Sequence, residues 1–229
     1  SVCFPRALFA WDDHRRVTRL SLESLEFGVL PSAVFETLES ALPSLGSGAT
    51  REEFANRIGI RGEKVEWNWA AGEGKPFSAI DVLEWSAQEP DNGMDQDLEL
   101  SPDQKYMGGV TGPSSQGIRH MFYPKWDWRR PLATFHFPTH VMGMAPERAQ
   151  LCFDLALRAA AGGHRFWSYR FLGWGLHYVE DMGQPYHASQ FASMRLLPLF
   201  TLFRGWDAFI AETTRRVGNF HLAFEYLTD

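Results

Sequence analysis

The sequence predicts a single all-α domain, residues 11–229, in which helices bracket a long irregular middle segment. Three observations lead to this prediction. Helix-start signals and apolar residues at helical spacing recur at both ends of the chain. The middle, about residues 62–144, scatters Gly, Pro, Trp and Asp without a period of two or 3.6 residues. Finally, the sequence contains no internal repeat or composition break that would separate two domains.

The N-terminal quarter contains three predicted helices. The first is capped by an aspartate and spans about residues 12–26, and the second opens with Pro-Ser and spans about residues 31–42. The third begins at a capping box formed by Thr50 and Glu53, just before the apolar Phe54.

Two further helices are predicted in the C-terminal half. Residues 146–161 begin with Pro at a helix-start position and stop at Gly162-Gly163. Residues 164–183 are apolar on most faces, which is typical of a central helix. The apolar stretch around residues 196–203 is interpreted as a buried helical insertion, with a lipid-facing lid as the alternative.

Composition excludes several classes of protein. Of the 229 residues, 45% are hydrophobic and 14% aromatic, too many for a disordered chain. The net charge of −6 excludes an overall basic field for a nucleic-acid backbone, and two cysteines exclude a disulfide framework. Residues 1–10 are interpreted as the tail of a cleaved export signal, which predicts a secreted or periplasmic location.

The densest chemical signal is the segment GLHYVEDMGQPYHAS. His177 and Asp181 are four residues apart, so on a helix they share one face and can bind one metal ion. His187 follows ten residues after His177, about 15 Å along a helix, and is expected to serve a neighbouring ion. Near the C-terminus His221 and Glu225 repeat the spacing of four.

Two more histidines have acidic neighbours. His14 follows two aspartates, and His120 comes after an acidic loop in which Asp91 is preferred over Asp95 as a ligand. The candidate ligands are then His14, Asp91, His120, His177, Asp181, His187, His221 and Glu225. One tetrahedral site uses about four ligands, so this set predicts two or more ions. Histidine and carboxylate ligands favour zinc over magnesium or calcium.

Simpler interpretations apply to some of these residue types. A lone histidine among apolar residues is usually a hydrogen-bonded core residue, and His136, His140 and His164 are interpreted in this way. The tryptophans at 85, 126 and 128 are equally consistent with lining a cleft and with covering the core. The conjunction of motifs favours metal at Asp181, because burying an unpaired carboxylate costs several kcal/mol.

The segment HYVEDMGQPYHA resembles the signature of the superfamily that contains zinc-dependent phospholipase C and fungal single-strand nucleases. The order of the other candidate residues, from Trp11 to Glu225, agrees with that family. The resemblance implies an all-α domain with a metal cluster at the bottom of a cleft. It also implies two or three zinc ions.

Carried over to this sequence, the family's ligands fall into three groups. The first ion is held by Asp91, His120, His177 and Asp181. The second ion is held by His187, His221 and Glu225. The third ion is held by His14, by Asp181 as a bridge, and by the amine and carbonyl of Trp11 once residues 1–10 are removed.

The implied activity is phosphodiester hydrolysis of the phospholipase C type, in which metal-activated water attacks phosphorus. Asp91 is the candidate to orient that water or accept its proton. The expected partners are a phospholipid or another phosphodiester and a membrane surface. The alternatives are a single-strand nuclease with the same ions and a metal-stabilised binding domain without catalysis.

Overall fold

The computed structural model describes residues 14–24, 30–46, 50–52, 54, 69, 74–91, 115–125, 127–129, 141–189 and 197–228. Of these residues 74% are helical, and two small two-stranded sheets occur among them. The predicted all-α class is confirmed. No helix in this part of the chain has the length and apolar character needed to cross a membrane.

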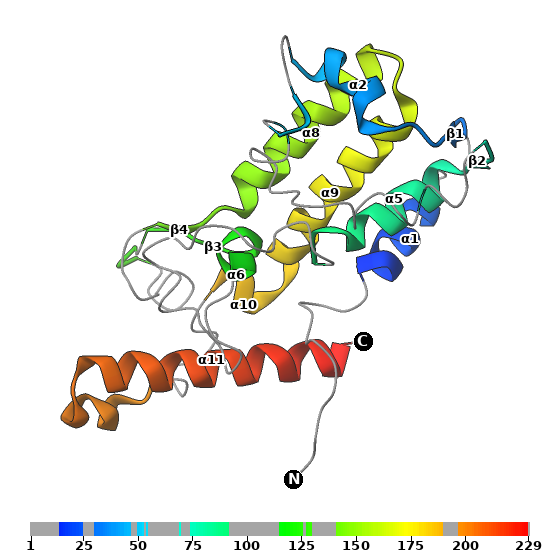
Figure 1. The fold of residues 1–229 in the computed structure, drawn as a ribbon. Coiled ribbons are helices and arrows are strands. Elements are labelled where there is room, and N and C mark those ends of the chain that lie inside the picture. Colours follow the sequence, from blue (N-terminus) through cyan, green and yellow to red (C-terminus); the bar gives the residue numbers. More distant parts are fainter. Residues whose placement is uncertain are drawn as a thin grey trace.

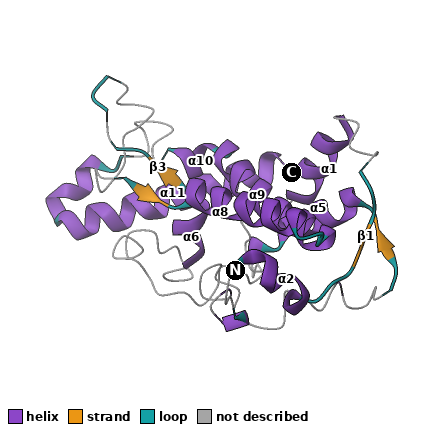
Figure 2. Cartoon of the chain, turned by 90° about the horizontal axis from the view of Figure 1, so that it is seen from above, coloured by secondary structure: helices purple, strands orange, loops and turns teal. Residues whose placement is uncertain are grey.

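Two long helices form the centre of the fold. α8 (Ala145–Ala161) and α9 (Arg165–Gly183) lie side by side and are joined by a tight turn (Figures 1 and 2). The turn contains Gly163, whose φ of +83° lies in the left-handed region that favours glycine. Both helices confirm those that the sequence predicts here.

α5 (Ala79–Gln88) packs against α9, and α1 (His14–Ser24) packs against α5 (Figure 1). Gly173 of α9 allows α5 to pack closely against α9. A Cβ atom at Gly173 would lie 2.8 Å from the carbonyl oxygen of Leu83, so only glycine lets the two backbones approach this far. The end of α5 is thereby held next to the C-terminal half of α9.

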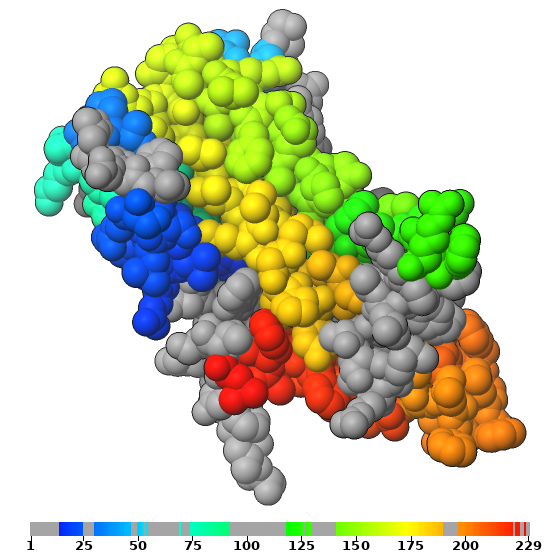
Figure 3. All heavy atoms as spheres, turned by 180° about the vertical axis from the view of Figure 1, so that it is seen from behind, coloured from blue at the N-terminus to red at the C-terminus, as the bar shows by residue number. Residues whose placement is uncertain are grey.

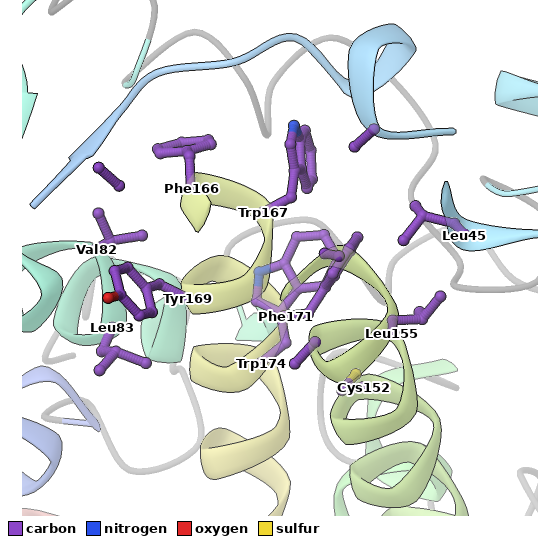
Figure 4. Packing of buried hydrophobic residues seen from close by; sticks show 14 of the residues in the cluster. Leu45, Val82, Leu83, Cys152, Leu155, Phe166, Trp167, Tyr169, Phe171 and Trp174 are labelled. Atoms are coloured by element: carbon purple, nitrogen blue, oxygen red, sulfur yellow. The ribbon is translucent and has the colours of Figure 1, made fainter. Parts of the chain in front are cut away.

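The apolar core surrounds the N-terminal half of α9. Trp167, Phe171 and Trp174 are at most 1% exposed, and neighbouring ring centroids lie 5.2–6.3 Å apart. Figure 4 shows Leu155 of α8 and Leu45 facing the same group of rings. Most of the aromatic residues lie in this half of α9, whereas the buried His177 and Asp181 lie in the other half.

The sequence predicts one helix over residues 31–42, and this prediction is wrong before Leu38. A short strand, β1 (Ala33–Val34), pairs antiparallel with β2 (Pro76–Phe77), and α2 (Leu38–Leu45) follows it. The indole N–H of Trp167 donates to the two carbonyls just before α2, at 3.0 and 3.1 Å. Contacts with β2 and α9 therefore determine the conformation here, and the local helix signal does not.

The middle segment, residues 62–144, is more regular than the sequence predicts. Besides β2 and α5, its described residues form α6 (Ser115–His120) and the antiparallel strands β3 (Phe122–Tyr123) and β4 (Met142–Gly143). A cap signal for α5 is present in the sequence. The hydroxyl of Ser78 accepts a 3.0 Å hydrogen bond from the backbone N–H three residues later.

The chain ends in a short α10 (Pro185–Ala188), a 3-10 helix η6 (Leu199–Arg204) and the long α11 (Trp206–Thr228). α11 crosses below the end of α9, and η6 projects at one edge of the molecule (Figures 1 and 3). The burial predicted for residues 196–203 is wrong from Leu199 onward. η6 has no buried residue, and its two phenylalanines are 86% and 90% exposed, because α11 carries η6 away from the α8–α9 pair.

The structure describes only part of the residues on which the other N-terminal predictions fall. α1 confirms the helix predicted over residues 12–26 between His14 and Ser24. The N–H of Phe54 donates to the carbonyl of Thr50 at 2.9 Å, as expected at a helix start. Glu53 and residues 1–10, the proposed export-signal tail, lie outside the described residues.

Candidate metal centre

The C-terminal half of α9 contributes two polar side chains to a buried cluster. His177 and Asp181 lie one helical turn apart and are both 0% exposed. Other elements bring further predicted ligands that are 1–2% exposed, namely His14 at the start of α1, Asp91 just after α5, His120 at the end of α6 and His187 in α10. Six of the predicted ligands thus meet in one buried place.

Four of these side chains form a compact group. Nδ1 of His120 lies 2.8 Å from both Nε2 of His177 and Oδ2 of Asp181, and the last two atoms are 3.1 Å apart. Oδ1 of Asp91 lies 3.6 Å from His120 Nδ1 and 3.8 Å from His177 Nε2. Zinc held tetrahedrally at about 2.0–2.1 Å keeps neighbouring ligand atoms roughly 3.3 Å apart. The group therefore has dimensions close to those of a zinc site.

The same two carboxylates also face His14. Nε2 of His14 lies 3.7 Å from Oδ2 of Asp91 and 3.6 Å from Oδ1 of Asp181. Each carboxylate thus has one oxygen near His14 and the other near His120. This is the arrangement in which a carboxylate can bridge two ions.

His187 and His221 meet at the side of the cluster nearest α11. Nδ1 of His187 lies 3.1 Å from Oδ1 of Asp181, and its Nε2 lies 2.9 Å from Nε2 of His221. The side chain of Glu225, the third residue predicted for this ion, lies outside the described residues. Two of the three predicted ligands are therefore side by side, and Asp181 connects them to the rest of the cluster.

Hydrogen bonds outside the cluster orient two of its histidines. Nδ1–H of His177 donates to the carbonyl of Ala87 at 2.7 Å, which leaves the Nε2 lone pair facing the cluster. Nδ1 of His14 lies 2.8 Å from Oε2 of Glu180, whose carboxylate also accepts from the hydroxyl of Thr18 at 2.6 Å. Sequence reasoning missed Glu180, although its position three residues after His177 places it near the same helix face.

The electrostatic environment supports the protonation states that metal ligands need. Burial raises the pKa of Asp181, but the imidazoles of His177, His120 and His187 outweigh this effect and hold its pKa well below the usual value. Burial lowers the pKa of His187, against the opposing effect of Asp181. The two directions favour the forms that bind a metal ion, an ionised carboxylate and a neutral imidazole.

A second polar group fixes the end of α5, two residues before Asp91. The carboxylate of Glu89 accepts from Arg170 at 2.9 Å and from the indoles of Trp69 and Trp174 at 2.8 and 2.6 Å. The sequence analysis missed this group as well. A buried arginine and two tryptophans all require hydrogen-bond acceptors. This requirement was the signal in the sequence that could have identified Glu89 as their partner.

Several predicted residues lie elsewhere. His164 contacts Glu36 at 2.7 Å, outside the cluster, as expected for a structural histidine. Trp85 is 46% exposed beneath the guanidinium of Arg15, and Trp128 is 71% exposed, so neither covers the core. Residues that lie outside the described part are Trp11, Asp95, Trp126, His136 and His140.

Comparisons with known proteins identify no relative of this chain. No family model matches it, and neither the curated proteins nor the solved structures contain a significant match.

Proposed function

We propose that this chain is a zinc-dependent phosphodiester hydrolase that resembles phospholipase C. The observation that carries the proposal is the pair of shared carboxylates. Asp91 and Asp181 are buried, and each faces His14 with one oxygen and His120 with the other. Two ions held side by side between such carboxylates are the usual machinery of metal-dependent phosphodiester hydrolysis.

The donor set fits zinc. Histidine nitrogens and carboxylate oxygens suit zinc, whereas magnesium and calcium prefer shells of oxygen. Oδ1 of Asp181 and Nδ1 of His187 are buried 3.1 Å apart, but the angles between them are not those of a hydrogen bond, and neither atom makes one elsewhere in the part of the chain that the structure describes. Leaving two such atoms unsatisfied is costly, and a cation near both removes the cost.

The contacts among the described residues support the ligand groups that the resemblance implies. One ion would be held by Asp91, His120, His177 and Asp181, and a neighbouring ion by His14 with the second oxygens of the two carboxylates. The approach of His187 to His221 supports a further position there, to which Glu225 would contribute. With residues 1–10 removed, Trp11 would contribute its amine and carbonyl to the ion at His14.

Zinc in such a centre supplies positive charge to a phosphoryl oxygen and lowers the pKa of water. The protein residues hold and orient the site. Ala87 fixes the tautomer of His177, and burial of the ligand side chains keeps bulk water from competing for them. The catalytic role of Asp91 as a base stays a prediction, because both of its oxygens face histidine nitrogens.

A lipid substrate is favoured over single-stranded nucleic acid. The exposed side chains of η6 are mainly leucine and phenylalanine, and the net charge of the chain is −6. Apolar exposure suits a lipid surface, whereas nucleic acid requires a positive groove with stacking aromatics. A secreted or periplasmic location would give the enzyme access to such a surface.

The test combines metal analysis with parallel assays. Purified protein loaded with zinc is expected to hold at least two ions and to hydrolyse phosphatidylcholine vesicles faster than single-stranded DNA. Faster cleavage of DNA would instead support the nuclease. Two tightly bound ions without hydrolysis of either substrate would support a binding domain, and one ion or none would refute the proposal. The matched control for the Asp181→Asn variant in these assays is Asp154→Asn, since Asp154 is an exposed carboxylate on α8.

A further inference from the structure

Glu180 joins the first helix of the chain to the helix that carries the centre. Its Oε2 lies 2.8 Å from Nδ1 of His14, and its Oε1 accepts from Thr18 at 2.6 Å. His14 and Thr18 are one turn apart on α1, and each is 1% exposed. Both oxygens of one carboxylate are therefore used by consecutive turns of α1.

This contact determines which nitrogen of His14 carries the proton. A carboxylate only accepts hydrogen bonds, so Nδ1 of His14 must be the donor. In the neutral ring Nε2 then has the lone pair, and this is the atom that faces Asp91 and Asp181 at 3.7 and 3.6 Å. The hydroxyl of Thr18 in turn holds the carboxylate of Glu180 in place.

We propose that Glu180 is a positioning residue that presents Nε2 of His14 to the centre as a ligand. His177 receives the same orientation from a neutral backbone carbonyl, whereas His14 receives it from a negative charge. A carboxylate partner makes an imidazole a stronger ligand, and loss of such a partner typically costs 10–100-fold in metal affinity. The inference rests on the proposed function only in identifying zinc as the ion that His14 binds.

The first measurement needs no metal. Long-range proton–nitrogen NMR on the metal-free full chain, labelled on its histidines and kept above neutral pH, reports the tautomer of His14. We expect the proton on Nδ1 in the native chain, a large loss of this tautomer in Glu180→Leu, and its retention in Glu180→Gln, whose amide oxygen still accepts. A proton on Nε2 of native His14, or no change in Glu180→Leu, overturns the proposal.

The second measurement titrates each variant with zinc alone. The matched control is Glu84→Gln, because Glu84 also holds α1, through Arg15 and Arg19, without touching His14. Zinc affinity is expected to fall about 10–100-fold in Glu180→Leu, less in Glu180→Gln and hardly at all in the control. Equal losses in Glu180→Gln and Glu84→Gln would mean that Glu180 only anchors the helix. If native protein binds no zinc but shows the expected tautomers, the hydrolase proposal fails while the role of Glu180 in orienting His14 stands.

Discussion

Asp181 is the single residue on which most of the candidate ligands converge. Its two oxygens lie 2.8–3.6 Å from nitrogens of His120, His177, His187 and His14. Asp181→Asn keeps the size of the side chain but removes the charge that two ions would share. We expect zinc affinity to fall by more than the 10–100-fold that is typical of a residue beside a ligand.

The measurement is competitive zinc titration together with the rate of phosphodiester hydrolysis. Glu225→Gln provides the comparison, because Glu225 is expected to hold one ion only. A small and equal effect of both substitutions would rule out a bridging role for Asp181.

Ionisation of the buried Tyr123 is expected to lower the free energy of unfolding at alkaline pH. It is 3% exposed, its hydroxyl donates to the carbonyl of Tyr186 at 2.6 Å, and burial raises the pKa of its phenol. A raised folded-state pKa means that this contribution to stability is complete below the unfolded pKa of about 10 and is lost as pH rises toward the folded pKa.

We therefore expect two effects of Tyr123→Phe. At neutral pH the free energy of unfolding falls by about 1 kcal/mol, because one hydrogen bond is lost. Above about pH 10 the native chain loses stability more steeply than the variant, since only the native chain has this phenol to ionise. Urea unfolding at both pH values measures the difference, and parallel pH profiles would contradict the assignment.

At the scale of secondary-structure elements, Glu89 fastens α5 to α9. Its partner Arg170 is 0% exposed, so Glu89→Ala leaves a buried charge without its carboxylate. We expect a loss of about 3–5 kcal/mol in the free energy of unfolding. The control is Glu39→Ala, which removes an exposed partner of Arg51 and should cost less than about 1 kcal/mol in chemical denaturation. Similar losses of unfolding free energy in both variants would show that the buried contact between Glu89 and Arg170 stabilises the fold no more than an exposed ion pair.

Substitutions in η6 are expected to affect substrate binding rather than stability, because its side chains face outward. Replacing Phe200 and Phe203 by serine should leave the melting temperature almost unchanged, since the two rings are 86% and 90% exposed. If the proposed lipid substrate is correct, hydrolysis of vesicles falls several-fold while hydrolysis of a water-soluble phosphodiester does not. A matched double substitution at the exposed Leu157 and Leu227 controls for general surface effects. A marked loss of stability would mean that η6 packs against another part of the protein.

Element prediction succeeded where local signals and tertiary contacts agree. α8 and α9 have a terminal proline, a glycine turn and apolar spacing, and both are found at the predicted positions. The helix predicted to begin at residue 31 begins only at Leu38, because pairing with β2 and a hydrogen bond from Trp167 depend on segments that are distant in sequence. α5 was missed although Ser78 caps it, since its short apolar pattern lies within a Gly- and Pro-rich region.

On the scale of the whole molecule, the cluster links α1, α6, α9, α10 and Asp91, which lies three residues after the end of α5. An ion bound there would stabilise the folded chain but not the unfolded one. Zinc at 100 times its dissociation constant should add about 2.7 kcal/mol to the free energy of unfolding, or roughly 5–10 °C in melting temperature. Differential scanning calorimetry with zinc and then with a chelator tests this, and Asp181→Asn should abolish the shift. Identical melting curves would contradict metal binding.

The site was more predictable than the fold around it. Spacing alone placed His177 and Asp181 on one helix face. Acidic neighbours indicated His14 and His120, and Asp91 was preferred in the acidic loop. The structure brings all five together. Spacing could not identify Glu180 or Ala87, because their roles depend on which ring nitrogen they face, and that follows only from how α1 and α5 pack on α9.

The contact between His14 and Glu180 also bears on the order of events during synthesis. The two residues are 166 positions apart in the chain. Contacts of such long range form late, because a large loop must close before they contribute. A nascent chain that ends before α9 contains His14, Asp91 and His120 but not the helix around which they gather. The centre is thus expected to assemble only after α9 has been made, and zinc would be acquired no earlier than that.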